Sequence, residues 1–134
     1  MAAARILYDA DCGFCRWSLA QVLWLDRHAR LRPVALQDPE ADVLLGAMSA
    51  EERMASWHLV AADGRVHSGG DAFPALLRLL PGGSPFARVL ASFPQACDVA
   101  YRAVAARRSS LERLVPAAGA ARARERIEAA ERRA

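Results

Sequence analysis

The first 36 residues alternate between short apolar runs and one longer amphipathic run, and this order restricts the possible folds most. "ARILYD" (residues 4–9) and "LRPVAL" (residues 31–36) are short apolar segments typical of buried strands. Between them, apolar side chains recur at helical spacing from Gly13 to about His28, which predicts an amphipathic helix. A strand, a helix and a strand of these lengths predict a βαβ unit with parallel strands and a right-handed crossover.

The middle of the chain carries start signals for two short helices and one hairpin. Asp38 followed by Pro39 is typical of an N-cap and first helical position, and "SAEE" (residues 49–52) has the capping-box pattern. Two strand-like runs flank Asp63-Gly64 within residues 56–70, a residue pair suited to a tight type I′ turn. We therefore expect an α/β sandwich, with a parallel βαβ unit first and an antiparallel hairpin second.

Helical patterns fill the chain after residue 70. Asp71 is expected to cap a helix that holds Pro74 in its first turn, and one or two further helices are interrupted at Pro94. We find no internal repeat and no linker long enough to divide the chain. The sequence therefore predicts one domain over residues 1–115, followed by an exposed C-terminal helix over residues 116–134 whose end frays.

Composition limits the class of protein. With 134 residues, 54% of them hydrophobic and 25% charged, the chain is typical of a globular domain that needs no structural disulfides. No window approaches the roughly 18 uninterrupted apolar residues of a membrane-spanning helix, and the first residues lack the pattern of a secretory signal. We therefore expect a cytoplasmic protein without a membrane partner, in which thiols stay reduced and a disulfide is transient.

The charge pattern argues against nucleic-acid binding. The net charge is +3, and all 18 basic residues are arginines, which we attribute to genome composition. Glutamates interleave with the late arginines, so that Arg124, Glu128 and Arg132 follow one another at i,i+4 spacing. This pattern indicates a solvated helix face, whereas a nucleic-acid surface would combine a basic stripe with fewer acidic residues.

The candidate site is "YDADCGFC" (residues 8–15), which contains two of the three cysteines of the chain. Cys12 falls where the first strand ends and the helix begins, and Cys15 lies one turn further along the helix. Unpaired amides and the positive end of the helix dipole favour a thiolate at a helix start. We therefore expect Cys12 to be the nucleophile and Cys15 the resolving thiol of a redox pair.

Two aspartates accompany the cysteines, and each has two possible roles. At the end of a buried strand, the Asp9 carboxylate is expected to lose solvent and to take a proton from Cys15. Alternatively, Asp9 or Asp11 caps the helix, and this reading is favoured for Asp11. The charge of Asp11 beside Cys12 also opposes the effect of the helix dipole on the thiol.

The motif and two later stretches resemble a known family. Asp9-x-x-Cys12-x-x-Cys15 after a strand resembles the signature of the DCC family of predicted thiol-disulfide oxidoreductases. "DGRVHSGGDAFPALLRLLP" (residues 63–81) and "YRAVAARR" (residues 101–108) resemble the middle and C-terminal stretches of that family. The resemblance implies a thioredoxin-like fold with additional C-terminal helices. It also implies disulfide exchange with a protein or a glutathione-like thiol, without an organic cofactor.

One departure concerns the cis-proline that thioredoxin-like enzymes usually carry before the third strand. That proline lies beside the nucleophile, and its backbone pairs with the substrate. Here no proline occurs between Pro39 and Pro74. Either another residue docks the substrate, or the substrate binds differently.

Several alternatives to a redox pair stay open. A structural zinc needs four ligands, and the remaining candidates Cys97, His28, His58 and His67 are isolated, so no metal site is expected. A cluster that bridges a dimer, inert buried cysteines and a non-catalytic redox-sensing or metal-binding module are further alternatives.

Three other features have a plain structural reading and a functional one. Cys97 is expected to be a core residue, and His58 and His67 to be surface or cross-strand residues of the hairpin. "GGD" (residues 69–71) could offer amides to an anion such as the carboxylate of glutathione, although turn chemistry is the simpler reading.

Overall fold

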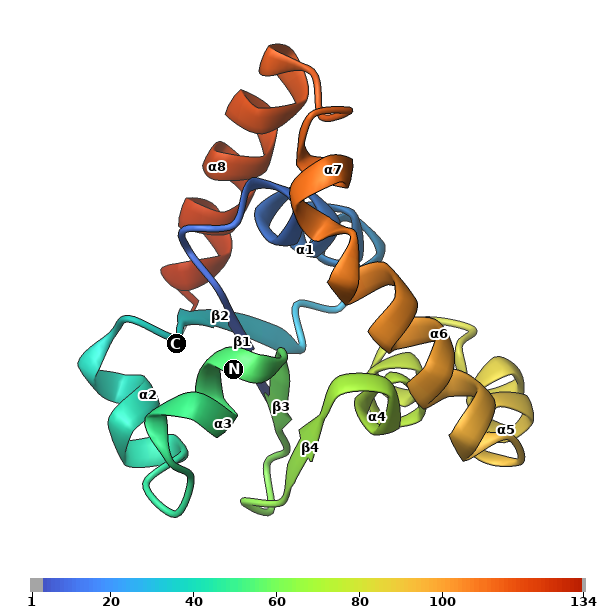
Figure 1. The fold of residues 1–134 in the computed structure, drawn as a ribbon. Coiled ribbons are helices and arrows are strands. Elements are labelled where there is room, and N and C mark those ends of the chain that lie inside the picture. The colour runs from blue at the N-terminus through green and yellow to red at the C-terminus, as the bar shows by residue number, and fades with distance from the viewer. Residues whose placement is uncertain (1–3, 134) are drawn as a thin grey trace.

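The protein folds around a mixed four-stranded sheet. The computed structural model describes residues 4–133, and its strand order is β2-β1-β3-β4 (Figure 1). The first pair is parallel and the other two pairs are antiparallel, with bounds β1 Ala4–Tyr8, β2 Leu31–Ala35, β3 His58–Val60 and β4 Val66–Ser68. The predicted sandwich of a parallel βαβ unit and a hairpin is confirmed, and it is consistent with a thioredoxin-like fold.

Helices connect and follow the strands. Their bounds are α1 Gly13–Leu25, α2 Pro39–Leu44, α3 Ala50–Ala55, α4 Ala72–Leu79, α5 Ser84–Ala91, α6 Pro94–Ala106, α7 Arg108–Glu112 and α8 Ala117–Glu131, with a 3-10 turn η1 at Gly69–Asp71. Asp38 and Ser49 cap α2 and α3 through their side chains, as predicted. Asp71 occupies the N-cap position of α4 without a side-chain capping bond, so its predicted capping role is wrong.

Two hydrophobic cores lie on opposite faces of the sheet, because successive strand residues point to opposite sides. On one face, Ile6 and Tyr8 of β1 pack with residues of α1, α4 and α8. On the other face, Leu7 packs with residues of β2, β3 and α2. The sheet is thus covered on both sides, as expected for strands whose sequence is mostly apolar.

The hairpin turn differs from the predicted two-residue turn. The amide of Ala61 donates to the carbonyl oxygen of Arg65, which leaves three residues in the loop. Gly64 has a φ of 87°, whereas Asp63 is not among the residues with positive φ. A type I′ turn requires positive φ at both central residues, so that prediction is wrong.

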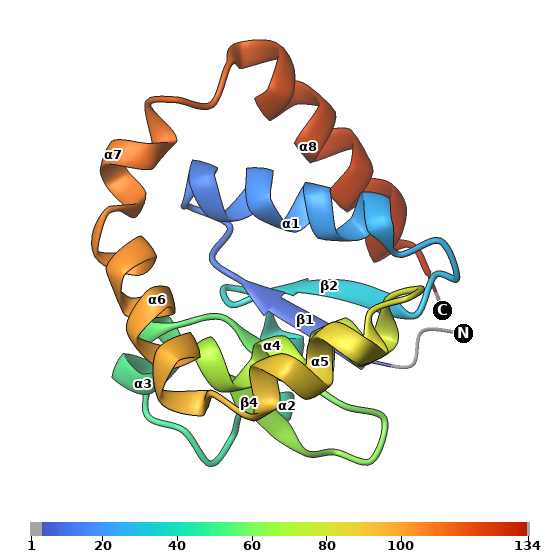
Figure 2. The ribbon, with the colours of Figure 1, turned by 90° about the vertical axis from the view of Figure 1, so that its right-hand side faces the viewer.

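Helix α8 packs on the domain instead of standing free. Ala123, Ile127 and Ala130 are buried, and Figure 2 shows α8 beside α1. Arg124 and Glu128 lie on the opposite, exposed face, as their spacing predicted. The expected exposure of the helix over residues 116–134 is therefore wrong for the inner face of α8. Its fraying and the domain boundary at residue 115 stay predictions, and Ala134 lies outside the described residues.

A buried ion pair fixes the end of α8 to the loop after α1. The Asp26 side chain is 0% exposed, and it accepts hydrogen bonds from the amides of Arg30 (3.0 Å) and Leu31 (2.9 Å). Arg133 donates to Asp26 Oδ2 over 2.9 Å and to the Leu31 carbonyl oxygen over 2.8 Å. Arg133, the last residue that the structure describes, is therefore tied to the loop after α1.

None of the helices in residues 4–133 combines the length and the apolar character that crossing a bilayer requires.

We predict that Arg133→Ala lowers the free energy of unfolding by about 2 kcal/mol. Removing one partner of a buried ion pair costs about 3–5 kcal/mol, and here the two amides continue to stabilise the Asp26 carboxylate. Urea unfolding followed by circular dichroism measures the change. The control is Arg132→Ala at an exposed neighbour, which should change stability by less than about 0.5 kcal/mol. Equal stability of the two variants would show that the pair does not anchor α8.

Candidate functional site

The two cysteines of the motif meet at the first turn of α1. Cys12 is the N-cap residue, and its Sγ accepts a hydrogen bond from the amide of Cys15 over 3.2 Å. The amide of Cys12 donates to the carbonyl oxygen of Asp9, which turns the chain from β1 into the helix. A sulfur thus takes the capping position where serine or aspartate is usual, and a helix amide points at it.

The two thiols differ in their surroundings. Both are free, Cys12 is 8% exposed, and Cys15 is half-buried. Burial, the hydrogen bond with Cys12 and the negative charge on Cys12 together raise the pKa of Cys15 to about 12. At neutral pH, Cys15 is therefore a protonated thiol beside the Cys12 sulfur.

The aspartates of the motif form a network with Gln37 outside the helix. Asp9 Oδ1 accepts hydrogen bonds from the amide of Asp11 and from Gln37 Nε2, both over 2.9 Å. Gln37 also donates to Asp11 and accepts from the amide of Ala10. The predicted capping by Asp11 is wrong, because Cys12 holds the cap and the Asp11 side chain is exposed.

A segment from the C-terminal half covers the start of α1. Glu112 of α7 accepts a hydrogen bond from the amide of Gly13 over 3.0 Å. A Cβ at residue 13 would lie 2.3 Å from Glu112 Oε1, so a side chain there would displace the carboxylate from the amide. Glycine at this position therefore permits the contact between α7 and α1.

Tyr101 of α6 contacts the segment that precedes β3. Its hydroxyl accepts a hydrogen bond from the amide of Trp57 over 3.3 Å, and its ring packs against Phe73. The carbonyl oxygen of Trp57 accepts from the amide of Gly69. Both main-chain groups of Trp57 are therefore paired within the protein itself. Residues 4–133 contain no cis peptide bond.

The comparison with known families agrees with this site. The family described as DCC1-like thiol-disulfide oxidoreductase matches residues 6–114. The chain belongs to the DCC1-like thiol-disulfide oxidoreductase family. The matched region begins within β1 at Ile6, includes the cysteine pair, α6 and α7, and ends before α8. No curated protein and no solved structure matches the chain.

Four residues of this DCC1-like site were not predicted from the sequence. They are Gln37, Tyr101, Glu112 and Arg108, whose charge lowers the pKa of Cys15. The stretch "YRAVAARR" contains Tyr101 and Arg108 and supported the family resemblance, but no residue in it suggested a role. Gly13 directly after Cys12 was a signal for a close contact, although nothing local shows that the contact comes from Glu112.

The glycine pair of residues 69–71 serves packing between elements. Gly69 and Gly70 are buried, and a Cβ at Gly70 would lie 2.7 Å from the backbone of Asp98 in α6. The amide of Gly69 is already paired with Trp57. The Gly69 amide is therefore not free for an anion, while an anion site at the remaining amides of "GGD" stays a prediction.

The other cysteine and the histidines lie apart from the pair. Cys97 is half-buried on α6, and its Sγ lies 3.6 Å from the Leu90 carbonyl oxygen. His58 is buried, contacts Ser68 across the hairpin and the Arg53 carbonyl oxygen, and has a pKa lowered by burial. The prediction of a cross-strand residue is confirmed for His58, but a surface position is wrong. In residues 4–133, no three His, Cys, Asp or Glu side chains are grouped closely enough to hold a metal ion.

Proposed function

We propose that the protein exchanges a disulfide with a protein or a low-molecular-weight thiol through Cys12 and Cys15. The observation that carries this proposal is the 3.2 Å contact between the Cys15 amide and the Cys12 sulfur at the start of α1. The family membership supports it. Because the main-chain groups of Trp57 are paired internally, we infer that the substrate docks differently from a thioredoxin substrate. A cytoplasmic location stays a prediction from the sequence.

The exchange takes two steps that together move two electrons to the substrate. The Cys12 thiolate attacks one sulfur of the substrate disulfide, forms a mixed disulfide and releases the other sulfur as a thiolate. Cys15 then loses its proton and attacks the Cys12 sulfur. The Cys12–Cys15 bond forms, the substrate leaves as a second thiolate, and an external thiol reductant restores the pair.

The pKa of Cys15 changes during this sequence in a way that favours the second step. In the resting dithiol, the charge and hydrogen bond of Cys12 help to raise the pKa of Cys15. In the mixed disulfide, the Cys12 sulfur is neutral, so its charge and its hydrogen bond no longer raise the pKa of Cys15. Burial of Cys15 continues to raise it. Cys15 is therefore kept protonated until the substrate is bound and loses its proton more easily afterwards.

We predict that Cys15→Ser accumulates a mixed disulfide and that Cys12→Ser does not. Serine at residue 15 leaves the attack by Cys12 intact but removes the thiol that releases the substrate. Incubation with glutathione disulfide, followed by intact-mass spectrometry and peptide mapping, measures the adduct at Cys12. An adduct at Cys15 in Cys12→Ser, with none at Cys12 in Cys15→Ser, would reverse the assignment of the two roles.

We further propose that Asp9 accepts the proton of Cys15 in the second step. Asp9 is half-buried near the pair, and its charge contributes to the raised pKa of Cys15. The hydrogen bonds from Asp11 and Gln37 use only Oδ1 of the carboxylate, which leaves Oδ2 to accept a proton.

We predict that Asp9→Asn slows resolution of the mixed disulfide by about tenfold or more between pH 6 and 8. Asparagine keeps an oxygen acceptor for Asp11 and Gln37 but removes the base. Stopped-flow quenching after mixing with glutathione disulfide measures the rate. Asp11→Asn, at an exposed carboxylate of the same network, is the matched control and should stay within twofold of wild type. Unchanged kinetics of Asp9→Asn across pH would remove this role.

The low exposure of Cys12 favours one alternative, a non-catalytic redox-sensing module in which small oxidants, but not protein disulfides, reach the pair. Repeated reduction of insulin by the protein in the presence of a thiol reductant distinguishes the two. Multiple turnovers support the oxidoreductase, whereas a single oxidation of the pair supports the sensor.

A further inference from the structure

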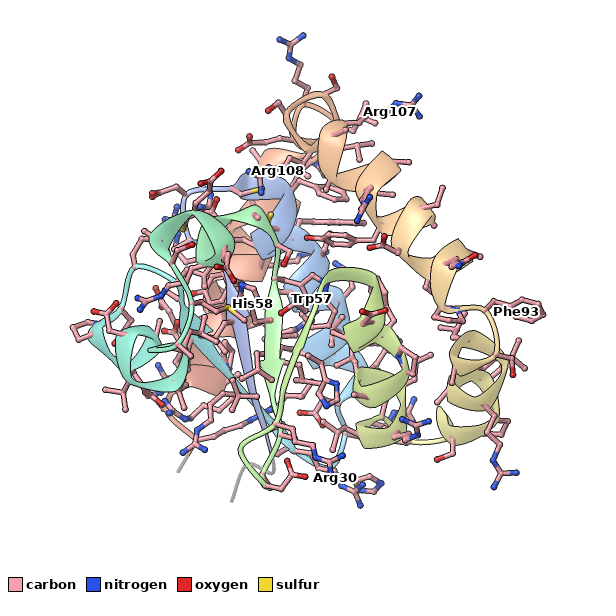
Figure 3. The ribbon with its side chains drawn as sticks, turned by 60° about the horizontal axis from the view of Figure 1, so that its bottom comes forward. Arg30, Trp57, His58, Phe93, Arg107 and Arg108 are labelled. Carbon is pink, nitrogen blue, oxygen red and sulfur yellow. The ribbon has the colours of Figure 1, made fainter. Side chains whose placement is uncertain are left out.

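Helix α7 presents one face to the first turn of α1. Glu112 on this face accepts the hydrogen bond from the amide of Gly13. Arg108 precedes Glu112 by four residues, one helical turn, so the two side chains project from the same face of α7. Arg108 is half-buried, whereas its neighbour Arg107 is exposed. Figure 3 shows Arg108 over the start of α1 and Arg107 directed away from the body of the protein.

We propose that Arg108 is a positioning residue for the second exchange step, in which its guanidinium stabilises the thiolate of Cys15 as that thiol attacks the mixed disulfide. This inference rests on the exchange proposed above. It adds to that exchange a residue from the C-terminal half of the matched family region.

The ionisable groups close enough to Cys15 to interact with its charge come from four elements. Cys12 lies at the start of α1, Asp9 in the loop after β1, Tyr101 on α6 and Arg108 on α7. Burial, Cys12 and Asp9 raise the pKa of Cys15, and the charge of Arg108 lowers it. The pKa of Tyr101 is raised chiefly by burial, so its phenol is neutral and leaves this charge balance unchanged.

The balance shifts when the mixed disulfide forms. Cys12 then carries no charge, and the negative charge that develops on Cys15 meets the guanidinium of Arg108 on one side and the carboxylate of Asp9 on the other. If Asp9 takes the proton, it becomes neutral at the same moment. Of the groups whose charge acts on Cys15, Arg108 then stabilises the attacking thiolate.

The test measures the reactivity of Cys15 alone, in a Cys12→Ser background. Iodoacetamide is a neutral reagent, and peptide mapping separates alkylation at Cys15 from alkylation at Cys97. We expect Arg108→Gln to slow alkylation of Cys15 about fivefold at pH 8, because the loss of the positive charge lowers the fraction of Cys15 that is thiolate. The effect is modest, because solvent screens a charge on a half-exposed side chain. Arg107→Gln removes the same charge from an exposed neighbour and should leave the rate within twofold. Arg108→Lys should restore most of it.

A merely structural role of Arg108 would change the rate in the opposite direction. Loss of a packing contact would loosen α7, expose Cys15 and speed its alkylation, and would also speed alkylation of Cys97 on the adjoining α6. The proposal is supported if Arg108→Gln slows alkylation of Cys15 and leaves the rate at Cys97 unchanged. Because the effect is electrostatic, 1 M salt should make this slowing smaller. An equal or faster rate at Cys15 in Arg108→Gln overturns it.

The role in exchange is tested with both cysteines present. Arg108→Gln should accumulate the glutathione adduct of Cys12 and resolve it about fivefold more slowly than wild type, while Arg107→Gln should resolve it normally. Resolution at the wild-type rate would overturn the role of Arg108 and leave the exchange itself intact. A wild-type protein in which glutathione disulfide produces neither the Cys12 adduct nor the Cys12–Cys15 disulfide would instead overturn the proposed function, so the two failures are distinct.

Discussion

The hydrogen bond from the amide of Cys15 to the sulfur of Cys12 sets the geometry on which the site depends. It requires that β1 end at Tyr8, that the chain turn at Asp9 and that α1 begin directly after Cys12. The same bond places the two thiols one turn apart and directs a helix amide at the first of them. The sheet and its two cores hold this junction in place, because β1 lies between β2 and β3 and is buried on both faces.

The C-terminal half of the chain completes the site and closes it. Helices α6 and α7 contain no buried residue, yet Tyr101 and Glu112 bond to the main chain at Trp57 and Gly13. Helix α6 also contacts the domain through the packing of the Tyr101 ring against Phe73 and the close approach of Asp98 to Gly70. Helix α8, in contrast, is held by a buried stripe and by the ion pair of Arg133 with Asp26. The segment beside the cysteines is therefore the less firmly packed part of the C-terminal half.

The sequence predicted those features that local patterns determine. The apolar periodicity of residues 4–36 gave the βαβ unit, and the position of the motif gave the placement of Cys12 and Cys15 at a helix start. Contacts between distant residues were missed, because Glu112 and Gly13 are separated by 99 positions and Tyr101 and Trp57 by 44. The packing of α8 was missed for a different reason. The interleaved arginines and glutamates suggested a solvated helix, while small alanines formed the buried stripe with Ile127.

A redox titration of the wild-type protein tests the central claim most directly. The protein is equilibrated with defined ratios of oxidised and reduced dithiothreitol or glutathione, quenched with acid, and mapped for the Cys12–Cys15 bond. The account predicts one two-electron transition, with a potential between about −270 and −120 mV as for other pairs of this type. A pair that forms no bond between Cys12 and Cys15 at any ratio would contradict it.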